Sequence, residues 1–318
     1  MEKLKVVITD YGFASLDPEK TILGQAGFLL EAYQCKTPED VLREGRDADA
    51  LLVQWAPVTG DVIRDLDRCK IIVRYGIGTD NVDLAAAKEK GIPVCNVPDY
   101  CINEVADHTL SMALVLGRQL KETEIQIQQG IWKIMPPKEL PAFREMIFAT
   151  AGFGRIAREV LDRARSFKFV LASYDPYISE TEMKSYGVRK LSIEELFREA
   201  DILSLHLPLN KQTHHFIDKE SLLKMKESAF LINTSRGGIV DTMALAKAIS
   251  QNQVGGAGLD VFEEEPLPLD HPLRKCDHTI LTSHTAWYSK SSGVLLQRKA
   301  AEEIVKGLNG ITSVNRVN

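Results

Sequence analysis

The middle of this chain carries a strand–turn–helix–strand pattern that strongly limits the fold it can adopt. Residues 146–151 form an apolar run, and the glycine turn that follows (152–157, GFGRIA) opens a helical stretch. A second apolar run over 169–174 ends at Asp175. A buried strand, a glycine turn and a helix N-terminus in this order are typical of a parallel α/β unit that binds a dinucleotide.

Each polar or small position of this pattern has a physical role. Gly152 permits a tight turn, and Gly154 lets the backbone approach a pyrophosphate, which the unpaired N–H groups of the helix N-terminus stabilise. Ala157 stands where glycine is more usual. Asp175 lies about 20 residues beyond Gly154, where a carboxylate can accept hydrogen bonds from both hydroxyls of an adenosine ribose. The flanking strands and the terminal acid argue against a glycine turn that merely feeds a helix.

The pattern lies near the middle of 318 residues, which leaves room for about one further domain. We therefore expect two doubly wound parallel α/β domains: a flavodoxin-like substrate domain of residues 1–100 and 287–318, and a Rossmann cofactor domain of residues 101–286 inserted into it. The other expected strands are residues 6–9, 50–53, 71–73, 93–95, 200–205, 229–233, 256–261 and 279–282.

Helix signals lie between the expected strands. Residues 37–40 (TPED) combine an N-cap, an early proline and an acid, and Asp83 and Gly91 bracket another helix. Residues 103–120 form a longer helix whose apolar face is broad, which predicts an interdomain or intersubunit element and a homodimer. Residues 292–308 form a final amphipathic helix.

Composition excludes several classes of partner. The net charge of −5 and the isoelectric point near 5.9 give no reason to expect nucleic acid or an acidic membrane. No apolar run reaches the length of a transmembrane helix, and residues 1–4 lead directly into a strand rather than a signal peptide. The five cysteines show no metal-site spacing, so we expect reduced thiols, a cytoplasmic protein and no metal.

Reactive side chains follow the expected strands of the second half. In open parallel sheets, ligands bind at the carboxyl ends of the strands. The convergence of such residues there predicts a redox cofactor site, and the residues are Asp175, His206, Arg236, Asp260 and His284.

Six motifs together resemble the D-isomer-specific 2-hydroxy acid dehydrogenases over nearly the whole chain. The last of them, with Trp287 and Tyr288 after the histidine, is most similar to the C-terminal binding protein branch. Two departures stand out: Ser283 replaces the usual proline before the histidine, and residues 143–146 replace a Gly-Lys-rich entry to the first strand. The motifs are residues 73–83 (VRYGIGTDNVD), 152–157, 174–177 (YDPY), 233–241 (NTSRGGIVD), 258–266 (GLDVFEEEP) and 282–289 (TSHTAWYS).

The resemblance implies NAD-dependent interconversion of a 2-keto acid and a D-2-hydroxy acid, with Arg236, Glu265 and His284 as catalytic residues. An imidazole donates a proton near neutral pH, a carboxylate orients it, and a guanidinium binds a carboxylate in a fork. Further implied cofactor contacts are Thr109, Gly152, Phe153, Gly154, Arg155, Ile156, Asp175, Pro176, His206, Leu207, Pro208, Thr213, Thr234, Ser235, Arg236, Asp260, His284 and Ala286. Implied substrate contacts are Arg74, Gly76, Ile77, Gly78 and Trp287.

Several alternatives stay open at this point. Glu265 belongs to an acid run that could be a solvated surface, and Trp287 is as compatible with core packing as with a substrate wall. As a wall, Trp287 would favour larger 2-keto acids, such as one bearing a methylthio group, over glyoxylate or hydroxypyruvate. His214 and His215 are more typical of a polar loop near the cofactor than of a metal site. A nucleotide-sensing scaffold of the corepressor type is the alternative function, although the chain ends just after its last helix, without a long tail.

Overall fold

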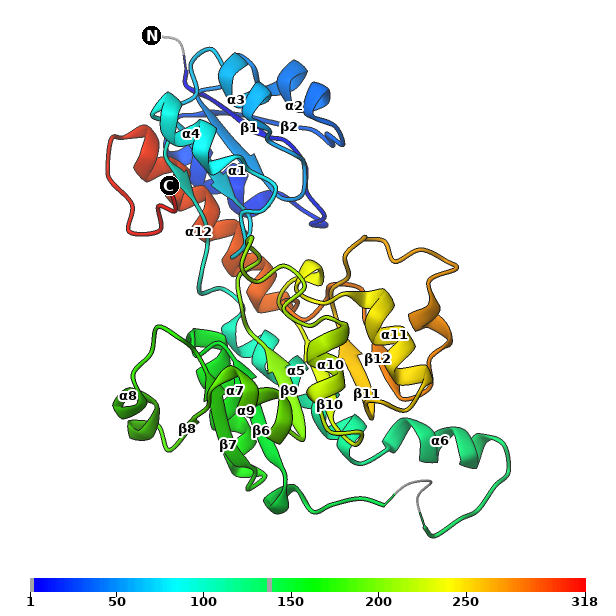
Figure 1. Ribbon diagram of the computed structural model, residues 1–318. Coiled ribbons are helices and arrows are strands. Elements are labelled where there is room, and N and C mark those ends of the chain that lie inside the picture. Colours follow the sequence, from blue (N-terminus) through cyan, green and yellow to red (C-terminus); the bar gives the residue numbers. More distant parts are fainter. Residues whose placement is uncertain (1–2, 136–138) are drawn as a thin grey trace. The chain divides into compact units, whose positions relative to one another are not determined.

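The chain divides into two compact units, each with its own parallel sheet (Figure 1). The computed structural model describes residues 3–135 and 139–318. Unit 1 combines Met1–Tyr100 with Tyr288–Asn318, and unit 2 is Cys101–Trp287. Each unit is described by itself below.

Unit 1 holds a five-stranded parallel sheet in the order β2-β1-β3-β4-β5, which is the flavodoxin-like doubly wound order. The C-terminal helix α12 packs against α1, β3 and β4, so both ends of the chain contribute to this unit (Figure 1). The strands are β1 (Lys5–Ile8), β2 (Leu29–Ala32), β3 (Ala50–Val53), β4 (Ile71–Arg74) and β5 (Val94–Cys95), and the helices are α1 (Asp17–Gln25), α2 (Pro38–Gly45), α3 (Gly60–Asp65), α4 (Leu84–Lys90) and α12 (Lys290–Leu308).

Local helix signals act in unit 1 as the sequence indicates. Thr37 forms a capping box with Asp40 at the start of α2. Asp83 accepts a hydrogen bond from the Ala86 amide at 2.9 Å, and Gly91 ends α4 in the left-handed region at φ +75°. These caps satisfy backbone groups that the ends of a helix otherwise leave unpaired.

Unit 2 holds a seven-stranded parallel sheet in the order β12-β11-β10-β9-β6-β7-β8. The order in which strands are added to the sheet reverses between β6 and β9. Open α/β sheets bind their ligands at such a switch point. The prediction of two doubly wound parallel sheets is confirmed. The strands are β6 (Ile147–Ala151), β7 (Val170–Tyr174), β8 (Arg189–Lys190), β9 (Ile202–Leu205), β10 (Phe230–Asn233), β11 (Gly256–Leu259) and β12 (Thr279–Leu281).

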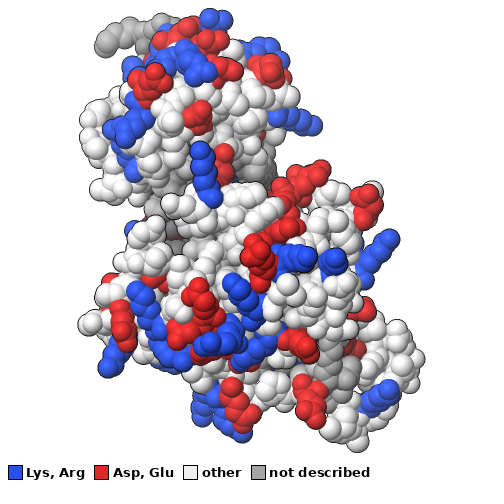
Figure 2. Space-filling model, viewed as in Figure 1, with Lys and Arg blue, Asp and Glu red and all other residues white. Residues whose placement is uncertain are grey.

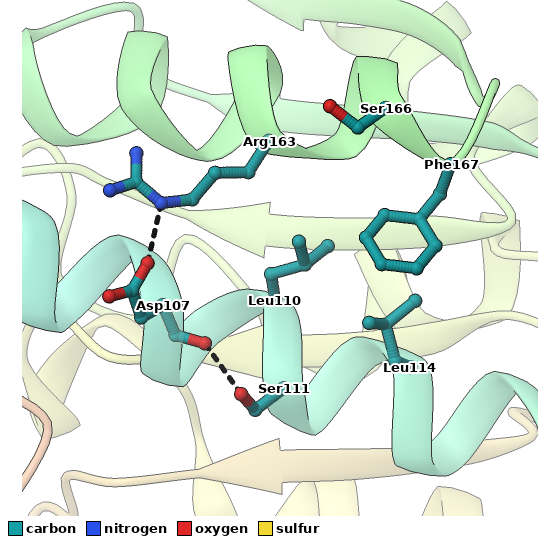
Figure 3. Close-up of a pocket in the computed structure, with 7 residues that line it drawn as sticks. All are labelled: Asp107, Leu110, Ser111, Leu114, Arg163, Ser166 and Phe167. Atoms are coloured by element: carbon teal, nitrogen blue, oxygen red, sulfur yellow. Dashed lines mark hydrogen bonds and ion pairs between the residues drawn. The ribbon is translucent and has the colours of Figure 1, made fainter.

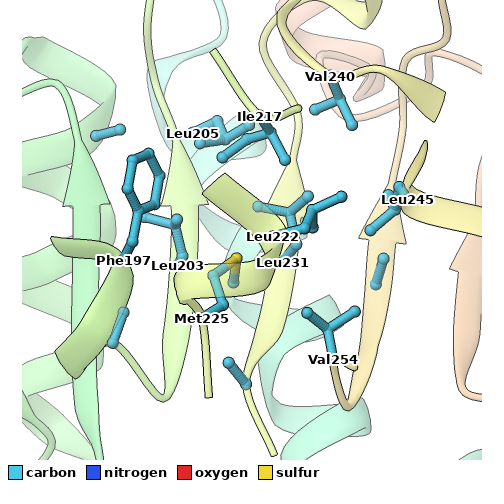
Figure 4. Packing of buried hydrophobic residues seen from close by; sticks show 14 of the residues in the cluster. Phe197, Leu203, Leu205, Ile217, Leu222, Met225, Leu231, Val240, Leu245 and Val254 are labelled. Carbon is cyan, nitrogen blue, oxygen red and sulfur yellow. The ribbon is translucent and has the colours of Figure 1, made fainter. Parts of the chain in front are cut away.

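Helices cover the sheet of unit 2 and close its core. Buried aliphatic side chains of β9 and β10, including Leu203, Leu205 and Leu231, pack against Phe197, Leu222 and other residues of the covering helices (Figure 4). The helices are α5 (Ile102–Gly117), α6 (Leu120–Gln128), α7 (Arg155–Ser166), α8 (Glu180–Ser185), α9 (Ile193–Glu199), α10 (Lys219–Lys224) and α11 (Thr242–Ser250).

The prediction of one continuous helix over residues 103–120 is wrong at its C-terminal end. It stops at Gly117, and Gln119 adopts a left-handed backbone at φ +50° before α6 begins. Gly117 packs closely against Phe143: a Cβ atom on it would lie 2.9 Å from the ring. The apolar residues of α5 are mostly buried against α7, β10 and β11, so much of its broad apolar face is covered within unit 2.

Candidate active site

The glycine turn after β6 lies against the loop after β9, at the switch point of the sheet. Gly152 has φ +96°, and a Cβ atom there would lie 2.4 Å from the carbonyl oxygen of His206, so only glycine fits. Gly154 caps α7, and a Cβ atom on it would meet nothing within 4 Å. The turn is thus closed on the side of β9 and open above the helix N-terminus, which suits an approaching pyrophosphate.

Asp175 is fixed at the end of β7 by two backbone donors. Its Oδ2 accepts a hydrogen bond from the Phe153 amide at 2.9 Å, and its Oδ1 accepts one from the Tyr177 amide at 2.9 Å. Each carboxylate oxygen retains a further acceptor position. The carboxylate therefore lies directly beside the glycine turn, with capacity to accept hydrogen bonds from two hydroxyl groups.

Arg158 holds the glycine turn from the side of α7. Its guanidinium lies 4.7 Å from the ring centres of both Phe153 and Tyr186. Its Nε donates to the Phe153 carbonyl at 2.9 Å, and one terminal nitrogen lies 2.6 Å from Glu182. Arg158 is therefore committed to the scaffold, whereas the neighbouring Arg155 and Gly154 are exposed at the mouth of the turn.

The loop after β9 contributes a neutral imidazole. His206 Nε2 lies 2.8 Å from the Ser204 hydroxyl, and burial lowers the pKa of His206 to about 3. The ring thus carries no charge near neutral pH and acts only through hydrogen bonds or packing. Farther along this loop, Thr213 donates its hydroxyl hydrogen to the Pro208 carbonyl at 2.5 Å, which ties the loop residues after Leu207 together.

Two buried threonines connect α5 to the loop after β10. The hydroxyl oxygens of Thr109 and Thr234 are 2.8 Å apart, and the Thr109 hydroxyl donates to the Val105 carbonyl at 2.7 Å. Thr109 is fully buried and Thr234 is nearly so. This pair fixes the start of the loop that carries Ser235 and Arg236.

A buried asparagine shapes the turn that presents Arg236. The Asn233 side chain donates to the Arg236 carbonyl at 2.8 Å, and its Oδ1 accepts from the amide and the hydroxyl of Ser235. The Arg236 guanidinium donates to the Ser235 carbonyl at 2.7 Å. The turn is therefore rigid, and the charged group of Arg236 is held above the carboxyl end of β10.

The glycine after Arg236 permits a close approach of two backbones. A Cβ atom on Gly237 would lie 1.8 Å from the Phe262 carbonyl oxygen and 2.5 Å from the Glu263 amide nitrogen. The close approach is thus between two backbones of the same unit. It brings the turn of Arg236 directly against the segment that carries Glu265.

Glu265 and His284 form a hydrogen-bonded pair. Glu265 Oε2 lies 2.8 Å from His284 Nδ1, and its Oε1 accepts from the Phe262 amide at 3.0 Å. Burial raises the pKa of Glu265, but the bond and charge of His284, the Phe262 amide and the charge of Arg236 together hold that pKa below its ordinary value. Glu265 is therefore ionised near neutral pH and only accepts, so His284 Nδ1 carries the hydrogen. Nε2 is left for another partner.

Asp260 holds the backbone of the loop that presents His284. Its carboxylate accepts from the Thr285 amide at 2.8 Å and from the Ala286 amide at 2.9 Å, and its carbonyl accepts from the His284 amide at 2.8 Å. Through these bonds His284 adopts a left-handed backbone at φ +56°. The loop is thus anchored on Asp260, with the unusual Ser283 exposed to solvent.

Three contributors to this site were missed at the sequence level. His108 Nε2 lies 3.1 Å from the Thr282 hydroxyl, which in turn donates to Asp260. Asn233 shapes the turn of Arg236, and Glu263 contacts residues far from it in sequence. A polar residue on the apolar helix α5 is a signal that could have identified His108.

The predicted substrate residues of the first half lie in unit 1, after β4. Gly76 has φ +140°, and a Cβ atom on it would lie 1.6 Å from the Arg74 guanidinium, which therefore folds over this glycine. The Gly76 carbonyl accepts from the Val97 amide at 2.9 Å, and the Ile77 carbonyl accepts from the Asn96 side chain at 2.6 Å. The loop that continues to Gly78 is thus held in place within unit 1.

Other predicted groups fall outside this constellation. Trp287 is the last residue of unit 2 and is half-buried. The rings of His214 and His215 stack at 4.0 Å, and His215 pairs with Glu263.

Among the described residues, no three His, Cys, Asp or Glu side chains are arranged to hold a metal ion. No helix in that part of the chain is long and apolar enough to cross a bilayer.

Comparison with known proteins identifies the family. Residues 110–286 match the family model of the D-isomer specific 2-hydroxyacid dehydrogenase, NAD binding domain. The chain belongs to this family.

The chain is 38% identical over 288 residues to D-3-phosphoglycerate dehydrogenase of Methanocaldococcus jannaschii, covering 89% of this chain and 54% of that protein. It thus spans about half the length of this curated relative. It is 33% identical to glyoxylate reductase of Korarchaeum cryptofilum, covering 92% of this chain and 90% of that protein. The structure of an acyclic imino acid reductase in complex with NADPH and D-Arg has a TM-score of 0.90 and 25% identity, covering 99% of this chain and all of that one.

The residues at the switch point fit an NAD molecule. Gly154 leaves open space above α7, and Asp175 offers free acceptor positions beside the turn.

The Asp175 carboxylate should repel the 2′-phosphate of NADPH, and a like-charge contact costs several kcal/mol. We therefore expect NADH to bind at least about 10²-fold more tightly than NADPH. Asp175→Ser should reduce this preference to near equality, measured by quenching of protein fluorescence. Asp162→Asn, an equal change of charge on the exposed side of α7, serves as control. Equal affinities in the unaltered protein would contradict the assignment.

Proposed function

We propose that this chain is an NAD-dependent D-2-hydroxy acid dehydrogenase, which interconverts a 2-keto acid and its D-2-hydroxy acid. The pairing of Glu265 with His284 Nδ1 at 2.8 Å carries the proposal. The pair belongs to an NAD-binding domain, and the backbone of Gly237 brings the turn of Arg236 against the segment that holds Glu265. General acid–base catalysis at a carbonyl requires a proton donor of this kind with a fixed orientation.

In this mechanism the chain supplies binding and the proton. When NAD(H) is bound, its nicotinamide supplies or accepts the hydride at the substrate carbon. Arg236 binds the substrate carboxylate through a forked pair of N–H donors. In the direction of reduction, the hydrogen on His284 Nε2 is transferred to the developing alkoxide oxygen, and the ionised Glu265 stabilises the imidazolium that precedes the transfer. Phe153, Gly154, Arg155 and Ile156 of the glycine turn, with Asp175 and Pro176, would hold the cofactor.

The pH profile of reduction tests the role of Glu265. Its depressed pKa means that the carboxylate stays ionised above that value and loses its charge only as the pH falls through it. Near neutral pH it therefore favours the imidazolium of His284, so Glu265→Gln should move the alkaline limb of kcat/KM for reduction to lower pH. The measurement is initial-rate kinetics with NADH across a pH series. An unchanged alkaline limb would argue against the pairing.

Turnover with a panel of substrates tests the function itself. The panel includes glyoxylate, hydroxypyruvate and larger aliphatic and thioether 2-keto acids for reduction, with D-3-phosphoglycerate for oxidation. If Trp287 forms an apolar wall, kcat/KM rises with side-chain size, by on the order of ten- to fifty-fold for two or three methylenes. A preference for glyoxylate or hydroxypyruvate would assign Trp287 to packing. NADH binding without turnover of any member would instead indicate a scaffold related to the C-terminal binding protein branch, which the Trp287–Tyr288 pair resembles.

The partners proposed are a small acid and a second copy of the chain, with no nucleic acid. Figure 2 shows acidic and basic side chains intermingled over the visible face, in keeping with the net charge of −5. All five cysteines are free thiols, which supports a reducing compartment such as the cytoplasm.

For the homodimer, the structure favours a surface other than α5. The shallow groove between α5 and α7 is lined by both polar and apolar side chains, and Arg163 and Asp107 pair across it (Figure 3). By contrast, α6 extends from the sheet of unit 2 (Figure 1), and seven large apolar side chains on it and after it are exposed. Exposed apolar surface of this extent is typical of an interface. The residues are Leu120, Ile125, Ile127, Ile131, Trp132, Ile134 and Met135.

Replacing two of these residues should dissociate the dimer. Burying such a side chain contributes about 1.5–3 kcal/mol, and a charge at the same place adds a desolvation cost. We expect light scattering to report a dimer for the unaltered protein and a monomer for the Ile127→Asp/Trp132→Asp variant. Val314→Asp, at a side chain 98% exposed in unit 1, should leave the dimer intact. A monomer at micromolar concentration without any substitution would contradict the proposal.

A further inference from the structure

Glu263 lies between Asp260 and Glu265 but makes contacts that the proposed chemistry does not use. Its Oε1 is 2.6 Å from Nε2 of His215, in the loop after β9. Its Oε2 accepts hydrogen bonds from the amide of Thr242, at 2.9 Å, and from the Thr242 hydroxyl. Burial raises the pKa of Glu263, but the Thr242 donors and His215 outweigh it, so the pKa is below its ordinary value.

These contacts join three segments that are far apart in sequence. Thr242 is the first residue of α11, and His215 lies in the loop that begins at His206 after β9. Glu263 itself is in the segment after β11. The carboxylate thus ties the segment after β11 to two neighbouring elements of the same unit, and it lies at a helix N-terminus, where a negative charge is favourable.

The backbone beside Glu263 contacts Glu265 and the residue that follows Arg236. The Phe262–Glu263 peptide lies against Gly237, the residue that follows Arg236. The Phe262 amide also donates to Glu265 Oε1 at 3.0 Å, and the other oxygen of Glu265 pairs with His284. A shift of this peptide would therefore change the orientation of Glu265 and displace the turn that carries Arg236.

The three consecutive acids have different surroundings. Glu265 pairs with His284, and Glu263 turns toward α11 and His215. Glu264 is exposed to solvent. Glu264 therefore provides a control with the same charge, one residue away from both neighbours.

We propose that Glu263 is a positioning residue for the reaction: by anchoring its segment to Thr242 and His215, it holds Glu265 in the orientation that pairs with His284. This role rests on the proposed dehydrogenase function. It predicts that removing the Glu263 carboxylate affects kcat through Glu265, and affects cofactor binding much less.

A double-mutant cycle on kcat tests this role. We expect Glu263→Ala to lower kcat by about ten-fold and to leave the NADH dissociation constant within about two-fold. In the background of Glu265→Gln, the same substitution should cost less than about two-fold, because the pairing it supports is already weakened. Glu264→Ala should match the unaltered protein, and Glu263→Gln, which keeps the size and an acceptor oxygen, should recover part of kcat.

The pH profile supplies a readout that a general loss of stability would not move. Glu263→Ala should shift the alkaline limb of kcat/KM in the same direction as Glu265→Gln does. If Glu263→Ala does not fold, Glu263→Gln and His215→Gln, which retain the Thr242 contacts, are compared by the same cycle and profile. Losses that multiply independently in the cycle, or a Glu263 variant with the kcat and pH profile of Glu264→Ala, would overturn the role. An unaltered protein that turns over no acid of the panel would remove the proposed function and this role with it.

Discussion

Replacing His284 with Asn is expected to lower kcat for keto-acid reduction by about 10²–10⁴, the usual contribution of a positioned proton donor. Asparagine keeps a polar side chain on the loop but has no proton to transfer at neutral pH. The loop itself is held by Asp260 through the amides of Thr285 and Ala286, so its backbone should persist in the variant. The dissociation constant of NADH should therefore change far less than kcat.

A second histidine of the same unit serves as control for this substitution. His278 pairs with Glu122 at 2.8 Å and precedes β12, so it lies at the amino ends of the strands, away from the candidate site. His278→Asn should leave kcat unchanged. A His284→Asn variant with nearly unaltered kcat would show that another group donates the proton.

Arg236→Lys should lower kcat/KM by about 10- to 10²-fold, because lysine can keep one of the two hydrogen bonds, and a hydrogen bond to a charged group contributes about 1.5–3 kcal/mol. Lysine keeps the charge but cannot form the forked pair of bonds. The turn that presents this residue is built by the Asn233 side chain on backbone groups, so it should survive the change. Initial rates over a range of keto-acid concentrations would show the loss chiefly as a raised KM together with a lowered kcat.

The matched control is Arg144→Lys, at a side chain that is 70% exposed and pairs with Glu145. It should behave as the unaltered protein does. If Arg236→Lys retained the full kcat/KM, the substrate carboxylate would have to be bound elsewhere, and the role of Arg236 would be restricted to its electrostatic effect on Glu265.

Much of the fold could be predicted from the sequence because the strands of a parallel sheet are continuous apolar runs. The strand at residues 50–53 and the strand ending in Asn233 show this plainly. β2 was missed because it is an edge strand, with Leu29 46% exposed and no buried apolar run to mark it. The break after Gly117 was missed because the residue with the left-handed backbone is Gln119, a residue type that does not mark a helix end in sequence.

Part of the candidate site could also be predicted from the sequence, and part of it could not. The positions of Asp175, His206 and His284 after strands follow from the local pattern, and so does the requirement for glycine at position 152. The surroundings of Glu263 do not, since its partners Thr242 and His215 become neighbours only when the loops after β9, β10 and β11 meet. Single residues can be aligned with motifs, but the contacts that orient them depend on the folded chain.

The stereochemistry of the product shows whether Arg236 and His284 hold the substrate in one orientation. The unaltered protein is incubated with NADH and each 2-keto acid of the panel that it reduces to a chiral product, and the hydroxy acid is resolved by chiral chromatography. Glyoxylate is left out because its product, glycolate, has no stereocentre. A site in which Arg236 fixes the carboxylate and His284 delivers the proton to one oxygen should present a single face of the carbonyl to the hydride. We expect the D enantiomer alone, formed in equal amount to the NADH consumed. The L enantiomer, a mixture of the two, or no consumption of NADH with any keto acid would contradict this expectation.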